Sequence, residues 1–321
     1  MVRLDVKGFA VRAPSVEHGA MAPPRSDIAR QISVISATVF MLIAAVVGVG
    51  LLGGTPVQDL QDGALGPDAT VLAPATPAFR IWSVIYVGLI AFAIWQALPS
   101  QRSRERQRAI GWLVALTAVL NGAWLLAAQF TNLPLTVVAI VALLVALSVL
   151  LVRTARFPRE TRLDAVLIDG VTGLHLGWVA LATVANTTAW LSRDLPASAG
   201  ANAETWGVVV LVVVALIGIV LAWRSARITP ALAMSWGLIW IAVGRLTGEP
   251  SSALVGFVAL GAAGLILLAM LVRGAVRWTG PATRFSGRSP LPRAGSAPPS
   301  APPRGSRAAR HPSAPRPARA S

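Results

Sequence analysis

The chain has 321 residues, of which 55% are hydrophobic and 13% charged, and its mean hydropathy is +0.66. A soluble surface cannot hide so much apolar side chain, and the apolar residues come in blocks of roughly 20, the length that crosses a bilayer. This composition argues against soluble enzymes, nucleic-acid-binding modules and secreted disulfide scaffolds. The absence of cysteine from the sequence also excludes thiolate metal sites and a cysteine nucleophile.

The net charge of +15 is concentrated near the ends of the sequence. Residues 250–321 hold ten arginines and no acid, and every basic residue of the chain except Lys7 is an arginine. The sequence beyond about residue 280 is rich in proline, arginine, alanine, serine and glycine, which predicts a disordered tail. Such a tail is either drawn to anionic headgroups or simply solvated.

Near-continuous apolar runs predict an all-α, polytopic membrane protein with about eight transmembrane helices. The expected spans are roughly 33–53, 79–98, 110–130, 134–152, 163–191, 206–223, 231–248 and 253–273.

The connections between these runs alternate in charge. Arginines accumulate before the first span, in the second, fourth and sixth connections and after the last span, whereas the other connections are nearly bare. By the positive-inside rule, both termini are expected in the cytoplasm of a bacterial-type inner membrane. A rival interpretation makes the first run a cleaved signal peptide, but its apolar stretch exceeds the typical 7 to 15 residues, and acids precede it. Met21 is an alternative start to Met1.

Three spans each carry a stripe of aromatic and polar residues at helical spacing. The stripes are Phe79, Trp82, Tyr86, Ala93 and Gln96 in the second span, Thr117, Asn121, Trp124 and Ala128 in the third, and His175, Trp178, Ala182 and Asn186 in the fifth. Polar groups are costly in lipid, so the stripes should face the bundle interior. They indicate either a ligand cavity or an interhelical hydrogen-bond network, closely packed through Gly173 and Gly177.

Two ionisable residues of the fifth span have different predicted environments. His175 is a candidate haem ligand or proton carrier, or else a hydrogen-bonded structural group. No further His, Cys or Met completes an obvious metal set with it, so no metal site is expected. Asp169 lies on another face of the helix, and we expect it to be satisfied by a neighbouring helix.

Three arginines at the outer ends of spans break the positive-inside pattern: Arg80, Arg193 and Arg245. The first two flank the expected cavity mouth, where they could bind the carboxylates of a ligand. The alternative is that all three snorkel, with Arg193 beside Asp194 and Arg245 near Glu249. The sequence shows no catalytic constellation, and an enzyme is not expected.

Three short motifs lie in these spans: FRIWSVIY at 79–86, LNGAW at 120–124, and WVALATVAN at 178–186 followed by Trp190. They resemble the tryptophan-rich sensory protein family, also called the translocator protein or peripheral benzodiazepine receptor family. The resemblance covers about residues 33–192, the five-helix core of that family, and residues 206–273 add three spans, as in a long-form member. A cytoplasmic segment 1–32 and the tail 280–321 complete the expected organisation.

The resemblance implies a five-helix bundle around a pocket for planar apolar ligands, notably porphyrins, with the first connection as a lid. Short members usually dimerise, so a homodimer is one candidate assembly. The chain departs from the family in its first connection, ATVLAPATPAF, which lacks a tryptophan, and at Leu174 and His175, where Pro-Tyr is usual. There is no tyrosine between Val184 and Arg193, so sterol binding is not implied.

The sequence thus predicts a membrane-embedded binding or sensory protein that holds a tetrapyrrole or similar planar apolar ligand between helices 2, 3 and 5. The expected site residues are Trp82, Tyr86, Asn121, Trp124, His175, Trp178, Asn186 and Arg80. No cofactor is required, and the expected partners are membrane lipid and the ligand, with no nucleic acid. Alternatives are a transporter of small amphipathic compounds and a scaffold that acts through its tail.

Overall fold

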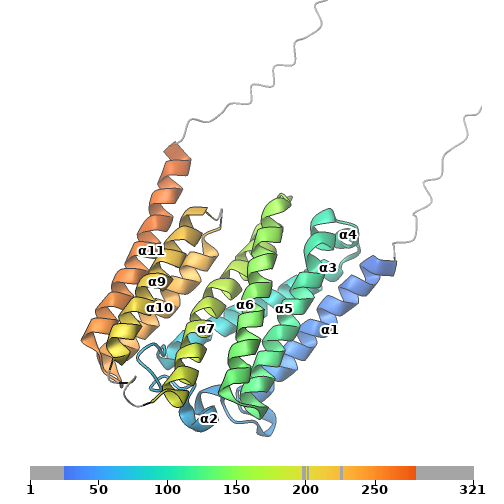
Figure 1. Ribbon diagram of the computed structural model, residues 1–321. Coiled ribbons are helices and arrows are strands. Elements are labelled where there is room, and N and C mark those ends of the chain that lie inside the picture. Colours follow the sequence, from blue (N-terminus) through green and yellow to red (C-terminus); the bar gives the residue numbers. More distant parts are fainter. Residues whose placement is uncertain (1–24, 197–199, 201, 225–226, 280–321) are drawn as a thin grey trace, which may run out of the picture. The chain divides into compact units, whose positions relative to one another are not determined.

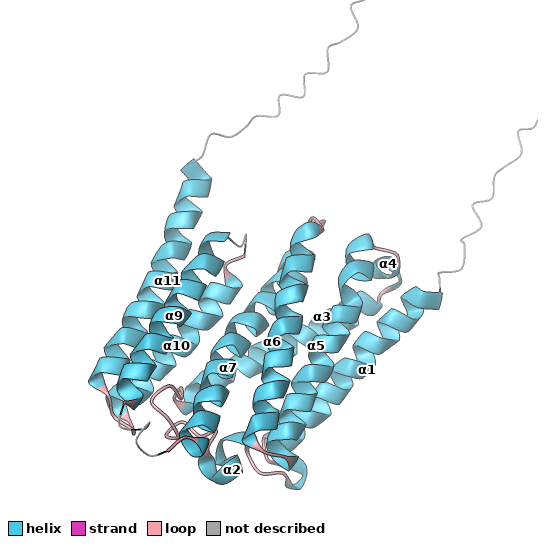
Figure 2. Ribbon diagram, in the orientation of Figure 1, coloured by secondary structure: helices cyan, strands magenta, loops and turns pink. Residues whose placement is uncertain are grey.

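A computed structural model of the chain describes residues 25–196, 200, 202–224 and 227–279, and these residues form helices and short connections (Figures 1 and 2). Most of the predicted segment 1–32, including Met21, and the whole predicted tail 280–321 lie outside the described residues. Within them, eight helices are long and apolar enough to cross a membrane, which confirms the predicted all-α membrane fold.

The long helices run in chain order with short elements between them. They are α1 (Arg25–Gly48), α3 (Ile81–Ala97), α5 (Glu105–Phe130), α6 (Leu133–Arg156), α7 (Val171–Asp194), α9 (Ala203–Arg224), α10 (Thr229–Thr247) and α11 (Ala253–Thr279). The turn η3 (Thr76–Arg80) leads into α3, and the wider π-helical turn η4 (Asp164–Gly170) leads into α7. The first connection contains η1 (Leu51–Gly53), η2 (Val57–Asp59) and α2 (Leu60–Gly63), and α4 (Pro99–Arg102) follows α3.

Five helices close into a ring. Helix α1 packs on α3 and α5, α5 on α6, α6 on α7, and α7 on α3. The remaining three helices attach through α10, which packs on both α7 and α11, while α11 packs on α9 (Figure 1). The three helices that carry the predicted stripes, α3, α5 and α7, therefore all belong to this ring.

The first span departs most from its predicted bounds, 33–53, because polar residues extend its start. Asp27 accepts hydrogen bonds from Arg108 at 2.8 and 2.5 Å. The Gln31 amide donates to the backbone carbonyl of Gln96 at 2.7 Å. These partners lie on other helices, so residues that look like a polar leader in the sequence are buried inside the bundle.

Glycines set the close approach of α7 to α10. A β-carbon at Gly173 would lie 2.0 Å from the hydroxyl oxygen of Thr229, and one at Gly177 would lie 2.3 Å from the carbonyl oxygen of Pro230. Only a residue without a side chain fits at either position. The predicted close packing through Gly173 and Gly177 is present, and it joins the five-helix ring to the additional helices.

Candidate functional site

An aromatic cluster fills the centre of the five-helix ring, with Trp82 of α3 in its middle. The Trp82 ring stacks on those of Tyr86 and Trp124, with centroids 5.3 and 6.2 Å apart and an interplanar angle of 23° in both pairs. It meets the rings of His175 and Trp178 edge-on at 5.7 and 6.2 Å. The three predicted stripes therefore converge, because helical phase places these rings on the inner faces of α3, α5 and α7.

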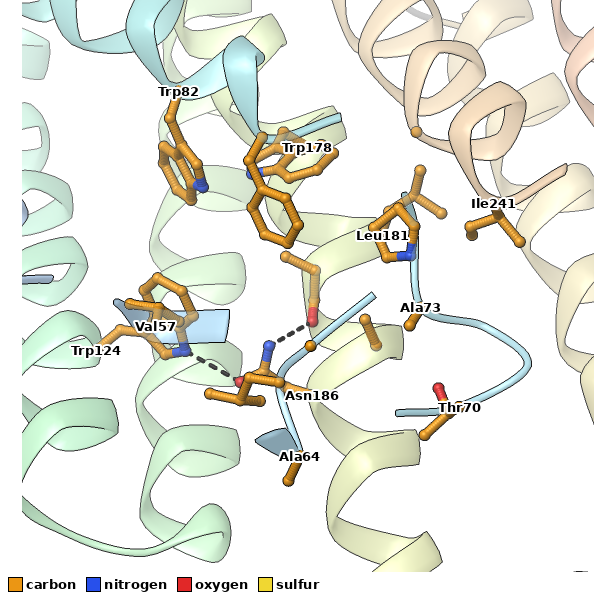
Figure 3. A pocket seen from close by; sticks show the side chains of 17 residues that line it. Val57, Ala64, Thr70, Ala73, Trp82, Trp124, Trp178, Leu181, Asn186 and Ile241 are labelled. Atoms are coloured by element: carbon orange, nitrogen blue, oxygen red, sulfur yellow. Dashed lines mark hydrogen bonds between the residues drawn. The ribbon is translucent and has the colours of Figure 1, made fainter. Parts of the chain in front are cut away.

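Polar side chains of the cluster bond to one another between helices. The Tyr86 hydroxyl donates to the side-chain oxygen of Asn121 at 3.3 Å. The Trp124 indole donates to the side-chain oxygen of Asn186 at 3.1 Å, and the Asn186 amide donates to the Ala182 carbonyl at 2.9 Å (Figure 3). The predicted interhelical hydrogen-bond network is thus present at the same place as the aromatic cluster.

Three other polar atoms of the cluster are buried and have no partner among the described residues. They are Nε2 of His175, Nε1 of Trp178 and Nδ2 of Asn121. His175 is 1% exposed, and its Nε2 makes no hydrogen bond of the kind that a structural histidine usually makes. Unsatisfied groups of this kind are unusual in a folded interior.

The space enclosed between α3, α5, α7 and α10 is small. The inner pocket there has a volume of about 40 Å³, with Trp82, Trp124, Trp178 and Asn186 among its lining residues. Part of the first connection covers it, through Ala64, Gly66, Thr70, Ala73 and Pro74 (Figure 3). Ligand sites for compounds of drug size are about 300–1,000 Å³, so the predicted cavity between helices 2, 3 and 5 is largely filled by rings and by this loop.

A larger space lies on the other side of the same rings. This groove, between α1, α3, α5 and the first connection, has a volume of about 700 Å³. Its aromatic and polar wall consists of Phe79, Trp82, Ser83, Tyr86, Trp124 and Gln58. Its apolar wall, on α1 and directly after it, includes Leu42, Ala45, Val46 and Val49. Phe79, Trp82 and Trp124 line both spaces, so these rings separate the groove from the inner pocket.

The predicted site residues fall into four groups by their position in the structure. Trp82, Tyr86 and Trp124 line the groove, and Trp178 and Asn186 line the inner pocket. Asn121 and His175 are buried behind them, and His175 also borders a separate void of about 10 Å³. Arg80 is exposed and lines neither space, although its neighbour Phe79 lines both.

Sequence reasoning missed the wall that α1 contributes. Its lining residues are aliphatic, like those that face lipid elsewhere on the same helix, and no polar or aromatic residue marks that face. Sequence reasoning also missed Ser83, which directly follows Trp82. A single small hydroxyl beside a stripe does not indicate a cavity.

The first connection is fixed in place by α10. The amide of Ala75 donates to the Trp240 carbonyl at 3.1 Å, and the Trp236 indole donates to the Ala78 carbonyl at 2.9 Å. Arg245, 1% exposed, adds four hydrogen bonds to backbone carbonyls of this connection and of the turn after α10. The loop that covers the inner pocket is therefore held by one of the three additional helices.

Among the described residues, Arg193 and Arg245 do not form ion pairs with the acids that lie near them in the sequence, Asp194 and Glu249. Arg193 donates to the carbonyls of Gln61 and Asp62 at 3.2 and 2.8 Å rather than pairing with Asp194, which accepts a hydrogen bond from the Trp190 indole. Arg245 binds the backbone carbonyl of Glu249 and not its carboxylate. Both arginines cap the first connection, because its irregular backbone presents carbonyls that no helix satisfies.

A ring of five apolar helices around a tryptophan-rich centre, with three further helices beside it, defines a multi-pass α-helical membrane protein. Residues 31–272 match the family model described as TSPO-like protein. The chain belongs to this family. The match extends over all eight candidate spans, so it includes the three helices beyond the ring. No curated protein and no solved structure matches the chain.

Proposed function

We propose that the protein is a membrane-embedded binding or sensory protein that holds a planar apolar ligand, with a tetrapyrrole as the first candidate, in the groove beside Trp82. The observation that carries this proposal is the aromatic wall of the groove. The ring planes of Tyr86 and Trp124 each make an angle of 23° with that of Trp82, on which both rings stack. All three rings border a space of about 700 Å³. Near-parallel rings favour a flat, apolar partner.

The ligand would enter sideways from the membrane. Ser83 and Val49 line the groove and are exposed, so the groove opens outward between α1 and α3. An apolar compound dissolved in the bilayer could reach the rings there without crossing the covered inner pocket. The arginine-rich ends of the helices would face the cytoplasm, and we assign the protein no catalytic role, no required cofactor and no nucleic-acid partner.

The test is a titration of the detergent-purified full chain with protoporphyrin IX, followed through the porphyrin absorption band. Ser83→Trp places a bulky ring in the groove, and Ser148→Trp places the same ring on an exposed face of α6. Binding should saturate near one porphyrin per chain. We expect Ser83→Trp to weaken it by about tenfold or more, and Ser148→Trp to leave it unchanged.

Two results would count against the proposal. A signal that rises linearly with porphyrin and is equal in both variants would mean partitioning into the micelle. Accumulation of porphyrin in proteoliposomes beyond the number of protein chains would mean transport instead of binding, since a binding protein saturates.

A further inference from the structure

A further pocket lies away from the aromatic cluster, between α6 and α9, at the ends of the helices that carry arginine. Its volume is about 460 Å³. Four arginines border it: Arg106 of α5, Arg159 of the connection after α6, Arg224 at the end of α9, and Arg227 before α10. The rest of the wall is mainly apolar, with Leu151, Val152 and Phe157 on the α6 side and Leu221 on α9. We call this space the arginine pocket.

One buried carboxylate serves three of these arginines. Oδ1 of Asp169 accepts hydrogen bonds from Arg106 and Arg227, both at 2.7 Å, and Oδ2 accepts one from Arg159 at 2.5 Å. Asp169 is satisfied by other elements, as the sequence predicts. Burial lowers the pKa of Arg227, and the charge of Asp169 acts against that shift. Arg224 also borders the pocket, so the guanidinium groups around it outnumber this one carboxylate.

Arg106 has donors to spare at this place. Its side chain is 3% exposed, and its Nε and Nη1 are buried with no hydrogen-bond partner among the described residues. Leaving guanidinium donors buried and unpaired is costly, because such donors lose their hydration without a compensating bond. The geometry therefore provides unused donors and uncompensated positive charge in one partly open pocket.

We propose that the arginine pocket binds the phosphate group of an anionic glycerophospholipid. The phosphate would supply negative charge to the pocket and acceptor oxygens to the unpaired donors of Arg106, since guanidinium groups bind phosphate oxygens through charge-assisted hydrogen bonds. Basic pockets between transmembrane helices, near one face of the bilayer, are suited to anionic headgroups. This site is separate from the groove and goes beyond the function proposed for it.

The apolar wall favours a lipid over free phosphate. Val152 of α6 borders the pocket and is 55% exposed, and Leu221 of α9 lies on the opposite side. An acyl chain can pack against these apolar side chains between α6 and α9, whereas inorganic phosphate has no apolar part that could do so. The pocket thus combines a charged end with an apolar side, as an amphipathic ligand requires.

The experiment is native mass spectrometry of the full chain, titrated with phosphatidylglycerol, phosphatidylcholine or inorganic phosphate. The test variant combines Arg159→Gln with Arg224→Gln, both of which are on the open side of the pocket. Arg156→Gln is the matched control, because Arg156 is an exposed arginine at the same end of α6 that does not border the pocket. Arg224→Gln alone is added, since Arg224 makes no bond to Asp169 in the described residues and its loss should not disturb folding.

Phosphatidylglycerol should bind more tightly than phosphatidylcholine, and each pocket arginine should contribute about fivefold, so the double variant should weaken binding by about 25-fold. Arg156→Gln should leave binding unchanged, and porphyrin binding should be equal in all variants. Equal binding of phosphatidylglycerol to wild type and double variant would overturn the proposal. Displacement of the lipid by millimolar phosphate would assign the site to a free anion and overturn the lipid assignment.

Discussion

Arg245 of α10 donates a hydrogen bond to the backbone carbonyl of Thr70, 175 residues earlier in the chain, at 2.9 Å. The same guanidinium reaches the carbonyl of Pro67 at 2.8 Å and those of Glu249 and Pro250 at 3.0 and 2.9 Å. Four backbone acceptors from two irregular segments thus share one buried cation. This contact gives the additional helices a structural role, because it fixes the connection that covers the inner pocket.

Replacing Arg245 should loosen that connection. Arg245→Gln leaves several buried carbonyls without a donor, and hydrogen bonds to charged groups contribute about 1.5–3 kcal/mol each, so we expect a loss of about 3 kcal/mol in stability. Thermal unfolding in detergent and proteolysis within residues 51–80 would measure it. Arg277→Gln, an exposed arginine of α11, is the control and should change neither. Wild-type protease resistance in Arg245→Gln would show that the hydrogen bonds of Arg245 are not needed to hold the first connection in place.

The seam between α7 and α10 should be sensitive to one added methyl group. In Gly177→Ala the new β-carbon would lie 2.3 Å from the Pro230 carbonyl oxygen and 2.9 Å from the β-carbon of Ala233. The helices must move apart, which should cost about 1–3 kcal/mol. Gly261→Ala on α11 meets nothing within 4 Å and should be neutral or stabilising by up to about 1 kcal/mol. Melting temperatures that fall equally in both variants would exclude close packing as the cause.

The sequence predicts the eight spans and the inner faces of α3, α5 and α7 because two strong signals agree. Apolar length marks the spans, and the 3.6-residue period places Trp82, Trp124 and Trp178 on converging faces. The empty space is not predictable in the same way. The volume of that space depends on how closely the indole rings and the first connection pack. The larger space lies against α1, and the sequence does not indicate this, because the aliphatic face of α1 resembles a lipid-facing one.

Long-range backbone contacts explain the other failures. From the sequence, Arg245 at the end of a span is interpreted as a snorkelling side chain. Two of its acceptors are carbonyls of the first connection, which is far away in the chain, so the sequence around Arg245 does not indicate them. Asp169 is different. Its helical phase sets it apart from His175, and a buried carboxylate requires a cationic partner, so its pairing with other elements can be predicted although the identity of the three arginines cannot.

The hydrogen bond between Trp124 and Asn186 can be measured by a double-mutant cycle. Trp124→Phe removes the indole donor, and Asn186→Leu removes the acceptor while keeping a similar shape. Hydrogen bonds between membrane helices contribute about 1 kcal/mol, so the coupling between the two changes should be of that size. A cycle of Asn186→Leu with Trp206→Phe, an exposed residue of α9, should show none. Additive effects of Trp124→Phe and Asn186→Leu would mean that the bond contributes nothing to folding.

Of the single substitutions proposed here, the one that removes the charge of Asp169 should lower stability most. Asp169→Asn keeps the shape but leaves the buried guanidinium groups of Arg106 and Arg227 without their counter-charge, and breaking a buried ion pair in this way costs about 3–5 kcal/mol. Glu204→Gln, which removes an exposed carboxylate at the start of α9, should change stability by no more than about 0.5 kcal/mol. Combining Asp169→Asn with Arg106→Gln removes one uncompensated cation and should restore part of the loss. If the double variant is no more stable than Asp169→Asn, the damage comes from lost hydrogen bonds, not from unbalanced charge. Thermal unfolding of the four proteins in one detergent separates these two causes.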